Sequence, residues 1–227
     1  MAISAEIVYN ISAALPQRNH ERGMWNMSEG KTCLADGTRW LPIRENPWNT
    51  EFDGTARARL RFDSEARCFH VTLNATERRI AMRAEAMEQN GRVWEDSCLE
   101  FFLNPMPEAG LGYMNFESNS RGVMLFGVHN GEMDGQTDVI TIADCRMVAT
   151  SRQLPGDLVN WTLRYRIPFD YIRRFFPGFD PKSGGRVTGN FYKCGDKCIQ
   201  PHYRTWSPIR PQPMTFHCPD QFGTILL

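Results

Sequence analysis

The segment from Val93 to Phe102 concentrates side chains whose types and spacing could do chemistry. In an extended strand, successive side chains alternate between faces, so one face presents Trp94, Asp96, Cys98 and Glu100. An indole beside carboxylates suits a sugar, because the C–H face of a pyranose stacks on the ring while charged groups bind its hydroxyls. Taken alone, the pattern more often marks a core tryptophan flanked by solvated acids.

A second aromatic-rich segment runs from Pro201 to Pro208 and reads HYRTWS between its prolines. The prolines and the lack of alternation predict a loop, and loops at the rim of a β-sandwich often carry binding residues. Trp206 could oppose Trp94 there and close an aromatic clamp. A tryptophan that pins the loop onto the core fits the same residues equally well.

Hydrolysis of a glycosidic bond is a competing interpretation of the carboxylates. It requires two carboxyl groups about 5 Å or 6.5–9.5 Å apart across a cleft. Asp96 and Glu100 are too far apart along one strand, at about 13 Å between Cα atoms. Glu117, on the next predicted strand, could partner Glu100, so an O-glycosyl hydrolase that uses Glu100 and Glu117 stays as an alternative.

Five potential zinc ligands follow later in the chain: Cys194, Cys198, His202, His217 and Cys218. The Cys194–Cys198 spacing lies within the range of structural zinc sites, but no second tight pair completes the set. Two buried thiols in a turn are the favoured interpretation.

The elements that must position these residues are mostly strands. Alternation predicts strands at 58–62, 68–73, 79–84, 93–103, 113–119, 123–128, 139–149, 159–167, 186–193 and 223–227, with one short helix at 170–176. This density of short strands and turns predicts an all-β fold, a two-sheet antiparallel β-sandwich of jelly-roll type. No Gly- or Pro-rich linker divides the chain, so residues 1–227 are expected to form a single domain.

Composition limits the class of partner. Lys plus Arg and Asp plus Glu are equal at 26 each, which favours neither nucleic acid nor an anionic membrane. The N-terminus lacks a signal-peptide pattern and no apolar run could span a bilayer, so a cytoplasmic protein is expected unless the chain was trimmed from a secreted one. Seven scattered cysteines do not suggest a disulfide framework, and all seven are expected to be free.

Four segments, in order, resemble the family 9 carbohydrate-binding modules, in particular the bacterial family 9-like branch. They are VWEDSCLEFFLNP, YMNFESNSRG, NFYKCGDKCIQPHYRTWSPI and FHCPDQFGTILL. The resemblance extends from about Trp40 to the C-terminus. It implies a β-sandwich without catalytic residues and a slot between two tryptophans for the end of a glucan or xylan-type chain.

Carried over by position, the resemblance implies that Trp94 and Trp206 form the slot and that Glu100 and Arg121 bind the hydroxyls, with Tyr203 nearby. No cofactor is required, and the calcium of similar modules is possible although no Asp-rich loop stands out. Similar sandwiches also carry haem in some redox subunits, which leaves a haem-binding subunit as a further alternative.

Overall fold

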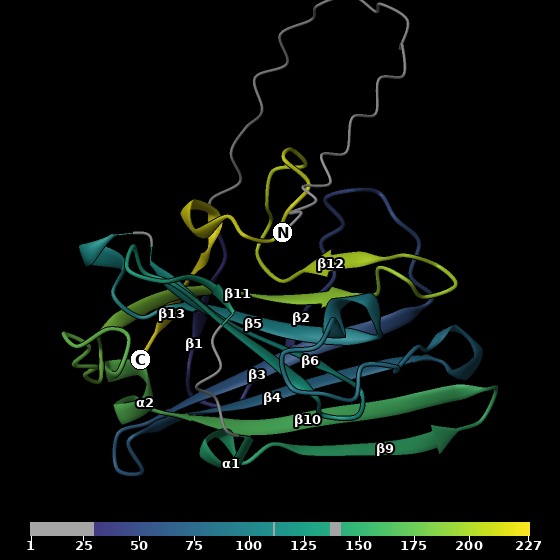
Figure 1. Ribbon diagram of the computed structural model, residues 1–227, viewed down its shortest axis with the longest axis horizontal. Helices are drawn as coiled ribbons and strands as arrows, with labels where there is room; N and C mark the ends of the chain where they lie inside the picture. Colours follow the sequence, from purple (N-terminus) through teal and green to yellow (C-terminus); the bar gives the residue numbers. More distant parts are fainter. Residues whose placement is uncertain (1–29, 111, 137–141) are drawn as a thin grey trace, which may run out of the picture.

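The alternating segments form two stacked sheets in the computed structural model, which describes residues 30–110, 112–136 and 142–227 (Figure 1). The larger sheet has the order β1-β13-β11-β5-β6-β7-β8, with β12 paired to β11. Its strands are β1 (Thr32–Leu34), β5 (Cys98–Asn104), β6 (Tyr113–Asn119), β7 (Met124–His129), β8 (Asp134–Gln136), β11 (Arg186–Cys194), β12 (Tyr203–Thr205) and β13 (Gly223–Leu226). The smaller sheet has the order β2-β3-β4-β10-β9 and contains β2 (Leu41–Pro42), β3 (Gly54–Asp63), β4 (Cys68–Arg78), β9 (Val148–Leu154) and β10 (Leu158–Pro168). The predicted two-sheet β-sandwich is confirmed, and its pairings are antiparallel except β1 with β13.

Helical structure is confined to short segments. The predicted helix is α2 (Phe169–Arg173), which begins directly after Pro168, and α1 (Ile142–Cys145) is a second single turn. Four 3-10 turns complete the set: η1 (Arg79–Ala81), η2 (Val93–Glu95), η3 (Pro107–Ala109) and η4 (Pro219–Gln221). The longest helical segment, α2, has five residues, so no helix in the described part of the chain could cross a bilayer.

One predicted strand is wrong and two are wrong in part. Residues 79–84 contain the turn η1 and no strand, and residues 142–145 are the helix α1. Residues 93–97 precede β5 as the turn η2 and a short connection, so Trp94 and Asp96 do not share a strand with Glu100. Residues 139–141 of the predicted 139–149 strand lie outside the described residues. So do residues 1–29 of the predicted 1–227 domain.

The main core lies between the sheets and is built from the inward-facing side chains of the long strands. Phe101 and Phe191, paired across β5 and β11, stack with ring centroids 4.6 Å apart, and Trp161 on β10 is fully buried opposite them. A second apolar cluster covers the outer face of the larger sheet, where Phe102 and Tyr192 meet loop residues such as Phe222. Both faces of the larger sheet are therefore covered, which suits the apolar runs in β5 and β11.

Candidate functional site

A cavity of about 530 Å³ lies on the outer face of the larger sheet. Its floor consists of side chains from four strands: Glu100 and Phe102 on β5, Asn115 and Glu117 on β6, Leu125 on β7 and Cys194 on β11. Its walls come mostly from segments outside these strands, and include Trp48, Trp94, Asp196, Tyr203 and the loop Met214–His217. The size and the mixture of aromatic and polar groups are those of a small-molecule site.

Two carboxyl groups lie side by side on the floor. Glu100 and Glu117 are directly opposite each other in the β5–β6 register, and both are buried. Burial, and then the charge of Glu117, raise the pKa of Glu100 well above its usual range. Burial also raises the pKa of Glu117 to about 7, against the hydrogen bond donated by the Asn115 amide. Near neutral pH this pair therefore holds a proton, so it presents both a hydrogen-bond donor and acceptors to a ligand.

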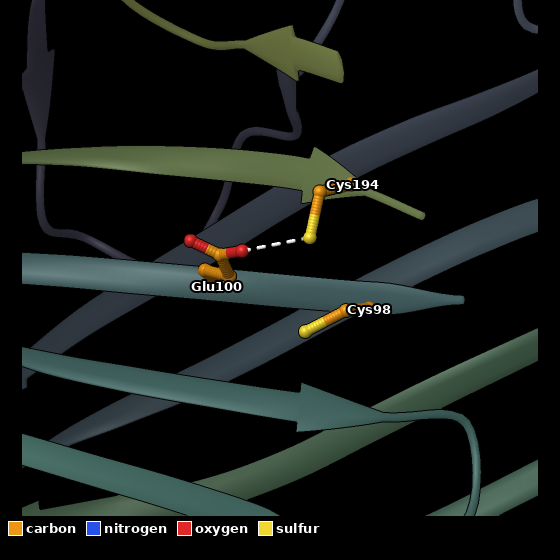
Figure 2. Close-up of side chains that lie close together, drawn as sticks. All are labelled: Cys98, Glu100 and Cys194. Atoms are coloured by element: carbon orange, nitrogen blue, oxygen red, sulfur yellow. Dashed lines mark hydrogen bonds between the residues drawn. The ribbon is translucent and has the colours of Figure 1, made fainter. Parts of the chain in front are cut away.

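Two thiols lie next to Glu100, and one of them, Cys194, lines the cavity floor. Cys98 and Cys194 are directly opposite each other on β5 and β11, and the Cys194 thiol donates a hydrogen bond to Glu100 Oε1 at 2.9 Å (Figure 2). Burial raises the pKa of both thiols, that of Cys98 to about 12, so both are protonated at neutral pH. All seven cysteines are free, as the sequence predicted.

One wall of the cavity is aromatic. Trp48 meets Tyr203 edge-on with ring centroids 5.2 Å apart and stacks on Phe216 at 5.1 Å. The Trp48 indole N–H donates to the carbonyl of Pro211 at 2.9 Å, which fixes the orientation of the ring. These three rings, Trp48, Tyr203 and Phe216, are called the aromatic wall below.

Trp94 approaches the cavity from the turn η2. Its carbonyl accepts a hydrogen bond from the Asp196 amide at 3.1 Å, and the Glu95 carbonyl accepts one from the Lys197 amide at 3.0 Å. The turn is thereby attached to the segment that follows β11. Trp94 is half-buried, so part of its ring is available to a ligand.

Asp96 holds the segment around Trp94 in place and does not reach the cavity. Its Oδ2 accepts hydrogen bonds from the backbone amides of Glu85 and Ala86 at 3.0 and 2.9 Å and from Asn119 Nδ2 at 3.0 Å. Its Oδ1 lies 3.2 Å from Arg83 Nε. The carboxylate therefore cross-links the 83–86 segment to the β6–β7 turn, a role that strand alternation could not reveal.

Trp206 is a core residue, which corrects the predicted pairing with Trp94. It is 2% exposed, lies in the core cluster and meets Phe191 edge-on at 5.8 Å. The register explains its position: Tyr203 is paired with Cys194 and shares its face, and three residues later the chain presents Trp206 to the opposite face. The interpretation of Trp206 as a residue that pins the loop onto the core is the one that the structure supports.

Arg121 also lies apart from the cavity lining. It is exposed in the β6–β7 turn, and its Nε donates to the Ala84 carbonyl at 2.9 Å. The structure therefore brings together Trp94, Glu100 and Tyr203 of the predicted site, and it does not bring Arg121 or Trp206 to them.

The zinc set considered from the sequence does not assemble. Cys194 lies on the cavity floor, whereas the Cys198 thiol lies 3.7 Å from Ser97 Oγ, and His202 Nε2 accepts a hydrogen bond from Lys193 Nζ at 2.7 Å. Within the described residues, the one group of three or more potential metal ligands is Cys98, Glu100 and Cys194. Two sulfurs do not suit calcium, which prefers six to eight oxygen ligands. Calcium binding stays a prediction.

Trp48 and Phe216 are cavity residues that the sequence did not identify as such. Trp48 follows Pro47 in a loop, and Trp206 lies in a segment bounded by Pro201 and Pro208, so an aromatic residue near a proline was the available signal. Asn115 had a clearer signal, because it shares a strand face with Glu117. Gly127 on β7 makes room for Asn115: a Cβ there would lie 2.3 Å from Asn115 Oδ1.

Comparison with known proteins identifies the family. The sequence profile of carbohydrate-binding family 9 matches residues 33–227. A crystal structure of a candidate carbohydrate-binding protein from Bacteroides uniformis is similar, with 27% identity and a TM-score of 0.72 over 87% of this chain and 99% of that one. A family 9 carbohydrate-binding module from Caldicellulosiruptor kristjanssonii, solved with glucose, shares the fold at 13% identity and a TM-score of 0.53, over 87% of this chain and 95% of that one. A search among curated proteins found no match. Because the family profile covers nearly all of the described residues, this chain belongs to carbohydrate-binding family 9.

Proposed function

We propose that this chain binds a neutral mono- or oligosaccharide in the cavity on its larger sheet and does not cleave it. The observation that carries the proposal is the combination of Trp94 and the aromatic wall with the buried pair Glu100 and Glu117 around one cavity. Aromatic faces can stack on the C–H face of a sugar ring, and the carboxyl pair can both donate to and accept from its hydroxyls. The Caldicellulosiruptor module solved with glucose supports a sugar as the ligand.

Trp94 and the aromatic wall replace the predicted pair of tryptophans as the stacking surfaces. Trp48 and Tyr203 belong to segments remote from η2 in sequence, and both line the cavity together with Trp94. A cavity of about 530 Å³ has a volume typical of small ligands rather than of a long polymer groove. This favours the end of a glucan or xylan-type chain, or a short oligosaccharide, over the middle of a long chain.

Calorimetric titration with a panel of neutral glucose- and xylose-based oligosaccharides tests the proposal. At least one should bind, and Trp94→Ala should weaken that binding by about 1–3 kcal/mol, the usual cost of removing an aromatic anchor. Trp40→Ala is the matched control, because the Trp40 ring lies outside the cavity, beneath the guanidinium groups of Arg57 and Arg59 at 4.2 Å. The proposal is wrong if no saccharide binds, or if Trp94→Ala and Trp40→Ala behave alike.

Preference for chain ends has its own measurement. Partial hydrolysis of one glucan gives samples of equal mass and different chain length. The number of binding sites per gram should rise in proportion to the number of chain ends. A constant number of sites per gram would show binding along the chain instead.

Hydrolysis is the second candidate, because Glu100 and Glu117 are directly opposite each other and line the cavity. Hydrolysis of a glycosidic bond requires two carboxyl groups that face each other across a cleft. Glu100 and Glu117 instead lie side by side on one floor. Prolonged incubation with the best-bound oligosaccharide should release no shorter product on chromatography. An absorbance spectrum of the purified protein separately tests the haem alternative, since bound haem absorbs strongly in the visible range.

A further inference from the structure

Cys98, Cys194 and Glu100 form a compact group of potential metal ligands, of which Cys194 and Glu100 line the cavity floor. One donor atom from each, the two Sγ atoms and a carboxylate oxygen, lie within 4.8 Å of one another. Figure 2 shows Cys98 and Glu100 on one strand and Cys194 on the neighbouring strand, with the Cys194 thiol directed at the Glu100 carboxyl group. All three side chains are at most 2% exposed.

The sheet holds this group rigidly. Cys98 and Glu100 are two residues apart on β5 and so share a face, and Cys194 is the direct partner of Cys98 on β11. Both strands are interior to the larger sheet, with neighbours on each side. Little backbone freedom therefore has to be lost when the three groups bind an ion.

The donor set selects the class of ion. Two thiolates and a carboxylate suit zinc and similar thiophilic divalent cations, and do not suit calcium or magnesium. Zn–S bonds of about 2.3 Å and Zn–O bonds of about 2.0–2.2 Å place tetrahedral donors roughly 3.5 Å apart. The present contact of 2.9 Å between Cys194 Sγ and Glu100 Oε1 would open slightly, which small side-chain rotations allow.

The cavity supplies both the path to the group and the remaining coordination position. Cys194 and Glu100 line the cavity directly, so an ion can reach them from solvent. Three protein ligands leave the fourth position of a tetrahedral ion open toward the cavity, for water or a hydroxyl group. Glu117, beside Glu100, and its Asn115 partner lie next to that position.

We propose that Cys98, Cys194 and Glu100 bind a thiophilic divalent cation, with Zn²⁺ as the representative ion. Binding releases the two thiol protons, and that of the Glu100 carboxyl group where it is protonated, to solvent, and it involves no change of oxidation state. The site goes beyond the proposed sugar binding, although it shares the cavity floor with it.

Titration of the reduced, metal-stripped protein with Co²⁺ tests the site, because Co²⁺ takes the place of zinc and is coloured. One equivalent should give a thiolate-to-cobalt charge-transfer band and the intense visible bands of tetrahedral cobalt, and Zn²⁺ should abolish both. Cys98→Ala and Cys194→Ala should each weaken binding by at least about 100-fold, and Glu100→Gln by at least about 10-fold. Cys33→Ala is the matched control, because Cys33 is a buried thiol on β1 outside the group.

Three results would overturn the site. They are the absence of a charge-transfer band in the reduced protein, a band that survives in both cysteine variants, and a band that Cys33→Ala removes equally. Cys98→Val serves as a second variant if Cys98→Ala does not fold, and circular dichroism checks both. Titration of the metal-stripped protein with oligosaccharides separates the two proposals. If the metal site does not exist, this titration still detects sugar binding; if no sugar binds, the Co²⁺ titration still tests the metal site.

Discussion

Trp94 and Trp206 show how one residue type takes two roles in the same molecule. Trp94 is half-buried and borders the cavity, whereas Trp206 is buried in the core, so tightly that a Cβ on Gly223 would lie 2.5 Å from its ring. Their sequence contexts, each with polar or proline neighbours, do not distinguish these roles. The difference comes from the register of β12 against β11.

Trp206→Ala should therefore lower stability. Loss of a buried tryptophan side chain costs about 3–5 kcal/mol, because the cavity left behind collapses only in part. Trp94→Ala should cost less than about 1.5 kcal/mol, since its ring is already partly in contact with water. Urea unfolding measures both free energies, and similar losses for the two variants would contradict this assignment.

His202 sits in a buried cluster of charges at the end of the core. Its Nδ1–H donates to the Gln200 carbonyl at 2.8 Å, so Nε2 is the unprotonated nitrogen that accepts from Lys193 Nζ. Lys193 Nζ also lies 3.5 Å from Glu77 Oε2, and neither side chain is more than 2% exposed. Burial, and then the positive charge of Lys193, lower the pKa of His202 to about 3, with a smaller contribution from Arg204.

The His202 pKa makes stability depend on pH in a defined direction. Between about pH 6.5 and 3, His202 is protonated in the unfolded chain, where its pKa is about 6.5, and neutral in the folded chain. The stabilisation is complete above about pH 6.5 and is lost as the pH falls toward 3, by at most about 1.4 kcal/mol per pH unit. His202→Gln, which still offers Lys193 an acceptor, should remove this part of the slope in urea unfolding between pH 6.5 and 4.5. An equal slope in both proteins would show that His202 contributes nothing to it.

The Asp96 carboxylate holds the segment 83–97 together from within, in addition to the backbone hydrogen bonds that the Trp94 and Glu95 carbonyls accept. Asp96 accepts three hydrogen bonds and lies against Arg83, so it fixes the turn η2, which carries Trp94, against the β6–β7 turn. The segment contains one named element, η2, and no strand, so no sheet ladder holds the amides of Glu85 and Ala86.

Asp96→Ala should loosen this wall of the cavity. Removal of one partner from a buried, hydrogen-bonded charge costs about 3–5 kcal/mol, since donors are left unsatisfied. Saccharide affinity should fall as well, because Trp94 loses its fixed position, and hydrogen exchange of the Glu85 and Ala86 amides should speed up. Unchanged exchange at these two amides would contradict the role given to Asp96.

Alternation of residue types was a good guide where a strand has partners on both sides. The β6 and β10 strands were predicted almost to the residue, and the shared face of Cys98 and Glu100 followed from the same rule. The rule failed at 79–84 and 93–97, where polar and apolar residues alternate but the backbone makes turns. There the structure depends on contacts between distant residues, such as Asp96 with the Glu85 amide, that no local pattern contains.

The sequence predicted only part of the site. Glu100, Trp94 and Tyr203 were identified and do border one cavity. Trp48 and Phe216 were missed, because loops from opposite ends of the sequence meet at the aromatic wall. Arg121 was carried over by position from the family resemblance, but it lies in the β6–β7 turn and does not line the cavity.

For the molecule as a whole, the two sheets separate stability from recognition. The main core lies between the sheets, and the cavity lies on the far side of the larger one, above a second apolar cluster. A ligand there binds the folded chain and not the unfolded one. Binding therefore adds to the stability of the entire sandwich.

Saturation with a bound saccharide should raise the melting temperature. At 100 times the Kd the gain is about 2.7 kcal/mol, which corresponds to roughly 5–10 °C for a chain of this size. Differential scanning calorimetry measures the shift, and Trp40→Ala should show it in full while Trp94→Ala should show a smaller shift at the same concentration. A saccharide that binds without any shift would have to bind the unfolded chain equally well.

The division of the cavity into a floor on strands and walls on loops also has an evolutionary consequence. A substitution on the floor alters a strand whose other face carries core residues. The floor is also closely packed: a side chain at Gly127 would displace Asn115. A substitution at Trp48, Trp94 or Met214 alters a loop and leaves the ladders intact. Selection, natural or in the laboratory, can therefore change the preferred ligand through the walls while the inherited scaffold stays constant.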